Sequence, residues 1–173
     1  MNVVEVANST RTRIDEELVA RLVARVLEEE GVRGAEVSVT FVGEARMREL
    51  NREHRGKDEV TDVLSFPLEE WELGEDTVAS LAPDLGEMAE AVVSGEAGPP
   101  LLLGDIVVCA RRALEQAAGD DLPPSFEVAV LLAHGTLHLL GYDHETDAGQ
   151  MALRQAEVLE LVDCEGIVVP PSR

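Results

Sequence analysis

A long apolar segment that ends in a cluster of histidines constrains the fold of this chain more than any other stretch. From Phe126 to Leu140, apolar side chains occupy almost every face of the expected helix. A helix that is apolar all round is buried inside a domain. Three of the four histidines in the chain stand at the end of this segment, at positions 134, 138 and 144. We therefore expect a central buried helix that carries a polar site at its C-terminal end.

The spacing of these histidines is typical of metal ligands. His134 and His138 are four residues apart, so on a helix they share one face, about 5–6 Å apart at Cβ. Gly141 can take a positive φ and end the helix, which allows the chain to bring back His144. Three imidazoles with a fourth position left to water are typical of a catalytic zinc site, whereas structural sites are closed by four protein ligands. One histidine in such a segment is more often a core residue, but three at this spacing favour a metal site.

The same pattern matches the H-E-x-x-H-x-x-G-x-x-H motif of the metzincin proteases, with one exception. The glutamate that serves those proteases as general base would occupy position 135, where this chain has Gly135. The metal ligands are present without the base, which argues against peptide hydrolysis.

Length and composition predict one domain over residues 1–173. The chain is 45% hydrophobic and long enough to bury a proper core. No apolar run approaches the length needed to span a bilayer, and no apolar segment of a signal peptide follows Met1. Cys109 and Cys164 form no CxxC pair, so we expect reduced thiols and a cytoplasmic protein.

The net charge of −21 opposes nucleic-acid binding on its face, because phosphate affinity comes largely from Lys and Arg. The charge is unevenly spread, however. Residues 1–57 carry ten basic and eleven acidic side chains, whereas residues 58–173 carry four and 24. Five cations fall within twelve residues: Arg46, Arg48, Arg52, Arg55 and Lys57. They form either a local basic patch or one face of a solvated helix balanced by neighbouring glutamates.

Periodicity and breaker residues predict the remaining elements. We expect strands over residues 3–6, 36–42, 63–66 and 101–109, and helices over 15–30, 44–54, 110–118, 126–140 and 147–162. Ser125 is the expected N-cap of the histidine helix. Residues 68–100 are acidic and without Lys or Arg, which predicts a mobile insertion, and residues 163–173 a tail. The mixture of strands and helices without strict alternation predicts an α+β domain, with a small mixed β-sheet covered by helices.

Four segments are distinctive as motifs. They are Arg55-Gly-Lys-Asp58, Thr61-Asp-Val-Leu-Ser-Phe-Pro67, Gly104-Asp-Ile106 and His134-Gly-Thr-Leu-His-Leu-Leu-Gly-Tyr-Asp-His144. Together they resemble the YbeY family of metal-dependent endoribonucleases, over roughly residues 36–67 and 101–160. The chain departs from the family at His54, where a tyrosine is common, and in the length and acidity of residues 68–100, which bear on how RNA approaches.

This resemblance implies a zinc-type site on His134, His138 and His144, and it places the family's catalytic arginine on Arg55. It implies a single-strand-specific, metal-dependent endoribonuclease of the cytoplasm, acting in ribosomal RNA processing at the 3′ end of the small-subunit RNA and in ribosome quality control. The partners it implies are single-stranded ribosomal RNA and the ribosome or a ribosomal protein, with no membrane.

The chemistry of these residue types agrees with that function. A metal held by three histidines polarises a phosphoryl oxygen and lowers the pKa of water toward about 7. The planar guanidinium of Arg55 suits the charge that develops on phosphoryl oxygens; its alternative role is a surface ion pair with Asp58 or Glu59. No general base is evident, since the candidate acids also suit positioning or turn roles: Asp62, Asp105, Asp143 and Glu145. The nucleophile, water or the RNA 2′-hydroxyl, stays open.

Two other functions remain open at this point. One is a metallohydrolase that acts on another substrate such as a peptide. The other is a non-catalytic ribosome-assembly factor whose metal holds the C-terminal helix in place, and this alternative predicts that metal removal unfolds the protein.

Overall fold

The computed structural model describes residues 1–68 and 100–171. The strands are β1 (Val3–Asn8), β2 (Ala35–Val42), β3 (Val63–Pro67) and β4 (Leu101–Cys109). They form one sheet in the order β1-β2-β4-β3. β1, β2 and β4 run parallel, and β3 runs antiparallel to β4. The small mixed sheet of an α+β domain, predicted from the sequence, is confirmed.

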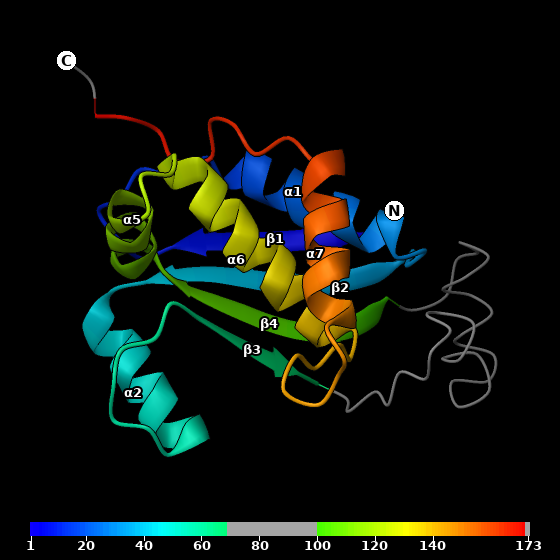
Figure 1. Cartoon of the computed structure of the whole chain (residues 1–173), viewed down its shortest axis with the longest axis horizontal. Coiled ribbons are helices and arrows are strands. Elements are labelled where there is room, and N and C mark those ends of the chain that lie inside the picture. The colour runs from blue at the N-terminus through cyan, green and yellow to red at the C-terminus, as the bar shows by residue number, and fades with distance from the viewer. Residues whose placement is uncertain (69–99, 172–173) are drawn as a thin grey trace.

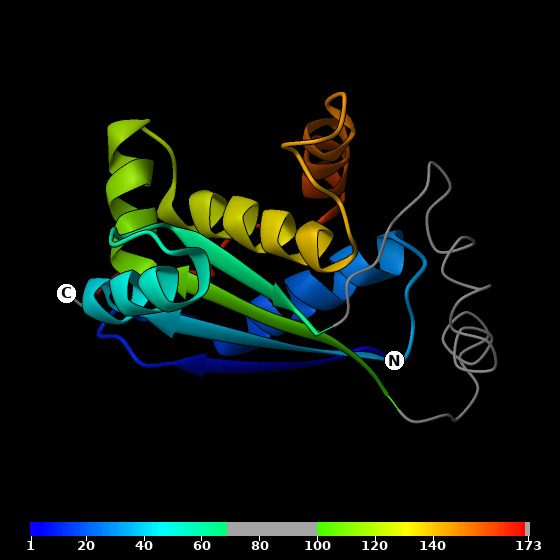
Figure 2. The ribbon, with the colours of Figure 1, turned by 90° about the horizontal axis from the view of Figure 1, so that it is seen from below.

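The helices cover mainly one face of this sheet. They are α1 (Glu16–Glu29), α2 (Glu44–Arg55), α5 (Ala110–Gly119), α6 (Pro124–Leu139) and α7 (Gln150–Leu161). Figure 2 shows α1 and α6 directly above one face, with α5 and α7 beside α6 and further from the strands. α2 lies beyond the β3 edge of the sheet (Figure 1). One main layer of helices therefore covers one face of the sheet, and α2 lies apart from that layer.

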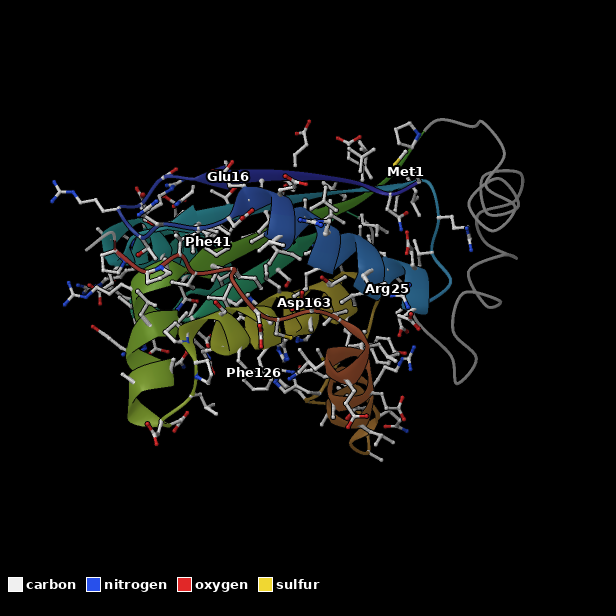
Figure 3. The ribbon with its side chains drawn as sticks, turned by 90° about the horizontal axis from the view of Figure 1, so that it is seen from above. Met1, Glu16, Arg25, Phe41, Phe126 and Asp163 are labelled. Carbon is white, nitrogen blue, oxygen red and sulfur yellow. The ribbon has the colours of Figure 1, made fainter. Side chains whose placement is uncertain are left out.

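The histidine helix is the centre of the domain, as predicted. α6 contacts α1, α5, α7, β3 and β4. Along residues 131–140, every residue is buried except His134 and His138, which are half-buried. Figure 3 labels Phe126 near the start of this helix and Phe41 in the sheet that it covers. α6 thus lies in the core, and its two histidines are the residues of this stretch that reach the surface.

α6 approaches the sheet closely at Gly135. A Cβ at this position would lie 2.8 Å from Cγ2 of Ile106 in β4 and 3.2 Å from Oγ of Ser65 in β3. Ser65 Oγ also donates a hydrogen bond of 3.2 Å to the Gly135 carbonyl. A side chain at 135 would point into the sheet, so the glutamate of the protease motif has no room here. Gly135 is needed because the side chains of Ile106 and Ser65 lie directly against the α6 backbone, and this contact also positions its neighbour His134.

The two faces of β4 serve two apolar clusters. Ile106 and Val108 belong to the main core beneath α1 and α6. Val107 and Cys109, which point the other way, pack with Met47 of α2 in a second cluster. Because side chains alternate across a strand, β4 fixes α2 and α6 on opposite faces of the sheet.

The predicted start of α6 is wrong. Ser125 is not its N-cap: Pro123 is, and α6 begins at Pro124, where the fixed φ of proline suits a first turn. The Ser125 hydroxyl instead accepts a hydrogen bond of 2.9 Å from the Val168 amide. The Ser125 hydroxyl therefore binds a distant backbone amide instead of capping α6.

The predicted start of α7 is wrong by three residues, because residues 147–149 form a turn before it. Asp147 accepts bonds of 2.8 Å from the amides of Gly149 and Met151, and Gly149 adopts a φ of 97°. The aspartate therefore caps the helix from outside, and α7 begins at Gln150.

The segment after α7 returns toward the start of α1. Figure 3 labels Asp163 in this segment. Ile167 is fully buried, and Val168 forms an isolated antiparallel bridge with Ile14. The predicted tail thus packs on the domain as far as Val168.

The insertion predicted over residues 68–100 lies outside the described residues except at its two ends, so its mobility stays a prediction. Within residues 1–68 and 100–171, no helix is both long and apolar enough to cross a membrane.

We predict that Gly135→Ala destabilises the protein. The nearest atom, Cγ2 of Ile106, belongs to a stiff β-branched side chain that is fully buried. Overpacking of this kind should lower the free energy of unfolding by about 1–3 kcal/mol, as measured by urea denaturation. Gly119→Ala is the matched control: it is also helical, but an added Cβ there meets nothing within 4 Å. Equal stability of the two variants would contradict the close approach.

Candidate metal centre

The structure brings the three predicted histidines together. The ring centroids of His134 and His138 lie 4.7 Å apart, and His144 lies 5.2 Å from each. One nitrogen from each ring lies within 4.8 Å of the others. His138 Nε2 and His144 Nδ1 are 3.1 Å apart, close to the separation of about 3.3 Å between two ligands of a tetrahedral ion with bonds of about 2.0–2.1 Å. The three imidazoles therefore fit one metal ion.

The end of α6 delivers the third histidine. Gly141 adopts a φ of 92°, as the sequence predicts, and its amide donates to the His138 carbonyl at 3.0 Å. The next amide, of Tyr142, donates to the Leu137 carbonyl at 3.1 Å. These two bonds satisfy carbonyls that a helix end leaves unpaired. The chain thereby turns back at once, and His144 lies over the face that carries the other two histidines.

Burial keeps two of the imidazoles neutral. Burial lowers the pKa of His138 to about 4, helped by the repulsion of a second positive charge on His134 or His144. Burial also lowers the pKa of His134. Only the neutral ring offers a lone pair to a metal. At neutral pH these residues are therefore ready to act as ligands.

Sequence reasoning missed the residue behind His134. Gln155 of α7 places its Oε1 2.9 Å from His134 Nδ1. Arg154, its neighbour, binds the buried carboxylate of Glu30 at the end of α1. Of these residues, only Glu30 stands out in the sequence. A carboxylate at the C-terminus of a helix interacts unfavourably with the helix dipole, which predicts a neighbouring cation. Nothing in the spacing of Gln155 pointed to His134.

Arg55 lies at the last turn of α2. Gly56 ends that helix in the left-handed region, with a φ of 68°. Asn51, buried within α2, donates to the Glu59 carbonyl at 2.9 Å and so fixes the following loop. The guanidinium of Arg55 is therefore presented from a fixed helix end.

The ion pair that the sequence offered as an alternative role for Arg55 is not formed. Asp58 is held by Arg48 instead, through hydrogen bonds of 2.8 and 2.9 Å, and this contact lowers the pKa of Asp58. Among residues 1–68 and 100–171, Arg55 has no carboxylate within ion-pair distance. Its charge is available to a ligand.

Two hollows meet at the histidines, each of about 300 Å³. The Lys57 hollow is walled by Arg55, Lys57 and all three histidines, among others. The Tyr142 hollow shares Arg55, His138 and His144 with it and adds Tyr142, Asp143 and Glu145. Arg55 thus faces the same space as the candidate metal ligands.

The acids that the sequence offered as candidate general bases either form hydrogen bonds that hold the fold together or lie away from the histidines, apart from two that line the Tyr142 hollow. Asp62 accepts bonds from the Val63 amide at 2.8 Å and from Gln116 at 3.1 Å, so it joins the start of β3 to α5. Asp143 accepts from the Glu145 amide at 3.0 Å, which lowers its pKa. Asp105 lines a separate hollow beside α2. Asp143 and Glu145 line the Tyr142 hollow, and neither is assigned as a base.

The chain is similar to one sequence family, to named relatives and to a solved structure. The sequence model of the family described as Endoribonuclease YbeY matches residues 5–163. Endoribonuclease YbeY of Thermoanaerobacter sp. (strain X514) is 45% identical over 143 residues, 82% of each chain. Endoribonuclease YbeY of Bacillus cereus (strain B4264) is 45% identical over 131 residues, 73% of this chain and 72% of that protein. The solution structure of TM1509 from Thermotoga maritima is similar, with a TM-score of 0.56, 26% identity, and coverage of 91% of this chain and 87% of that one.

We predict that each of His134→Ala, His138→Ala and His144→Ala abolishes stoichiometric binding of one divalent transition metal, because two imidazoles leave the ion under-coordinated. His54→Ala is the matched control: it removes the fourth histidine, whose ring packs at a tilt against Phe66 with centroids 4.9 Å apart, outside the cluster. Metal content after dialysis against trace zinc is the measurement. Loss of metal from the His54 variant alone would refute this assignment.

Proposed function

This chain belongs to the YbeY family of endoribonucleases, and from that premise we propose how its candidate centre works. The protein is a metal-dependent endoribonuclease specific for single strands. It processes ribosomal RNA, at the 3′ end of the small-subunit RNA, and takes part in ribosome quality control. It acts in the cytoplasm with the ribosome or a ribosomal protein as partner.

One observation carries this proposal: Arg55 and the three histidines wall the same hollow. These residues come from two elements, α2 and the end of α6 with its following loop. A metal site alone would need only the histidines. The Arg55 guanidinium, which has no carboxylate partner within residues 1–68 and 100–171, supplies what a phosphodiester requires, a fixed positive charge beside the reacting phosphorus.

The three histidines hold the metal, and we assign zinc. Neutral imidazoles in a set of three suit a catalytic zinc ion. When bound, zinc supplies Lewis acidity to a phosphoryl oxygen and lowers the pKa of water. Glycine at 135 leaves no glutamate base beside the ligands, and this favours a phosphodiester over a peptide as substrate.

Arg55 stabilises the charge that grows on the phosphoryl oxygens during attack. Its planar guanidinium donates two parallel hydrogen bonds to such oxygens. Because Arg55 has no competing carboxylate among the described residues, it loses no ion pair when the substrate enters.

The charges around the two hollows indicate how the RNA strand lies. Lys57, beside Arg55, walls the Lys57 hollow, whereas Asp143 and Glu145 wall the Tyr142 hollow. The Lys57 hollow is also lined by Glu59 and Asp62, so two cations face two acids there, whereas in the Tyr142 hollow Arg55 alone faces two acids. Phosphates are therefore less strongly opposed in the Lys57 hollow. The chain has only five aromatic side chains, too few for a base-stacking platform. The protein therefore contacts the backbone, and a ribosomal partner selects the sequence.

We predict that Arg55→Glu abolishes RNA cleavage and that Arg55→Lys reduces it by about 10²–10³-fold, the loss typical when one donor to a developing oxyanion is removed. His138→Ala should be inactive because it loses metal. Each metal-quantified variant is incubated with single-stranded RNA, and the product ends are identified. A 5′-phosphate indicates water as the nucleophile, and a 2′,3′-cyclic end indicates the 2′-hydroxyl.

The charge-matched control is Arg21→Glu. Arg21 is exposed on α1, where it pairs with Glu17, so this variant changes net charge by the same amount away from the hollow. It should cleave as the wild type does. Equal cleavage by all the variants would identify a contaminating nuclease, and no cleavage by metal-loaded wild type, even on a ribosomal substrate, would refute the proposal.

We also predict that chelation leaves the protein folded. The core under α6 is built of apolar side chains, and the histidines lie at its margin. At a metal concentration 100-fold above Kd, binding stabilises by about 2.7 kcal/mol, which for a chain of this size is a fall in Tm of roughly 5–10 °C on removal. Far-ultraviolet circular dichroism should be retained. Global unfolding at room temperature would favour the assembly factor with a structural metal.

A further inference from the structure

α7 contributes to the metal centre without supplying a ligand. Gln155 Oε1 lies 2.9 Å from His134 Nδ1. An amide oxygen only accepts hydrogen bonds, so the proton of the neutral His134 ring lies on Nδ1. The lone pair is then on Nε2, the nitrogen that remains for a metal. This contact therefore selects the tautomer of the ring as well as its orientation.

α7 is itself held by a buried carboxylate on another helix. Glu30 is only 5% exposed and pairs with Arg154 Nε. Arg154 Nη2 also donates to the Glu29 carbonyl at 3.0 Å. Gln155 follows Arg154 directly, so these contacts fix the turn of α7 that faces His134.

The same carboxylate reaches the loop that carries the third histidine. Tyr142 Oη donates to Glu30 Oε2 at 2.9 Å, and Tyr142 is two residues before His144. The two oxygens of Glu30 thus hold α7 and the loop after α6 at one point. His134 and His144 are both supported from this carboxylate, from outside the set of ligands.

We propose that Gln155 is a positioning residue of the metal centre, which orients His134 and fixes its tautomer, and that the Glu30–Arg154 pair holds Gln155 in place. This inference rests on the metal centre of the proposed function, but it concerns metal affinity rather than cleavage. α7 does not need Gln155 for packing, because Met151 and Val158 are its buried residues. The polar contact with His134 is what this side chain adds.

Two substitutions separate positioning from packing. Gln155→Leu keeps a side chain of similar size and removes the acceptor. Gln155→Glu keeps an acceptor at the same distance along the chain and provides the carboxylate partner often found behind metal-bound histidines. If Gln155 only fills space, Gln155→Leu should retain zinc affinity better than Gln155→Glu. If Gln155 positions His134, the order of the two affinities should be reversed.

The experiment measures zinc affinity by competition with a chromophoric chelator, on full-length protein shown to be folded by its thermal transition. Gln155→Leu should bind zinc about 10–100-fold more weakly than wild type, and Gln155→Glu should bind within a few-fold of wild type. Gln150→Leu is the matched control: Gln150 is exposed at the start of α7, where it accepts from the Ala148 amide, and its loss should leave affinity unchanged.

A second measurement is independent of affinity. In the zinc-loaded wild type, the His134 Nδ1 proton should give a slowly exchanging nuclear magnetic resonance signal, because it is half-buried and bonded. This signal should be lost to fast exchange in Gln155→Leu and kept in Gln155→Glu.

The outcomes distinguish this inference from the proposed function. If Gln155→Leu binds zinc as tightly as wild type, whether or not Gln155→Glu binds more weakly, the role of Gln155 is overturned and the proposed function is untouched. Wild type that binds no zinc overturns both. Wild type that binds zinc without cutting RNA refutes the nuclease, while the ranking of the Gln155 variants still decides this inference.

Discussion

The architecture depends on one close approach, that of α6 to the sheet at Gly135. Without a side chain there, the helix backbone comes near enough for Ser65 to bond its carbonyl and for Ile106 to fill the space beneath. The contact joins the segment containing β3 to the histidine helix. It also fixes the rotation of α6 about its own axis, because position 135 faces the sheet while positions 134 and 138 emerge at the margin of the core. The absence of a side chain at one residue thereby sets the direction of two imidazoles.

Short turns at the ends of α6 and α2 place the remaining functional side chains around this helix. Gly141 reverses the chain and brings back His144, and Gly56 ends α2 so that Arg55 faces the histidines. His138 and Arg55 lie in the last turns of α6 and α2, His134 lies at the margin of the core, and His144 lies in the loop that follows α6. The protein thus combines a rigid support with access to solvent, the arrangement that holds ligand geometry and still admits a polymer.

Local features made most of the fold and the three histidines predictable. The apolar pattern of α6, the alternation in β2 and the spacing of the histidines are all readable within a few turns of chain. The two errors have different causes: Ser125 binds the distant Val168 amide instead of capping α6, and a local turn centred on Asp147 delays the start of α7. Gln155 could not be found, because its partner lies 21 residues away on another helix. Arg55 was identified by resemblance, since its neighbouring acids suggested an ordinary ion pair.

The pairing of Glu30 with Arg154 has a consequence for how the chain folds. These residues are 124 positions apart, and Tyr142 reaches the same carboxylate from 112 positions away. No local segment brings Glu30 near Tyr142 or Arg154, so these contacts exist only when α1, α6 and α7 have packed together. In a chain whose α1 has not docked, the imidazoles lack these supports and have no preorganised geometry.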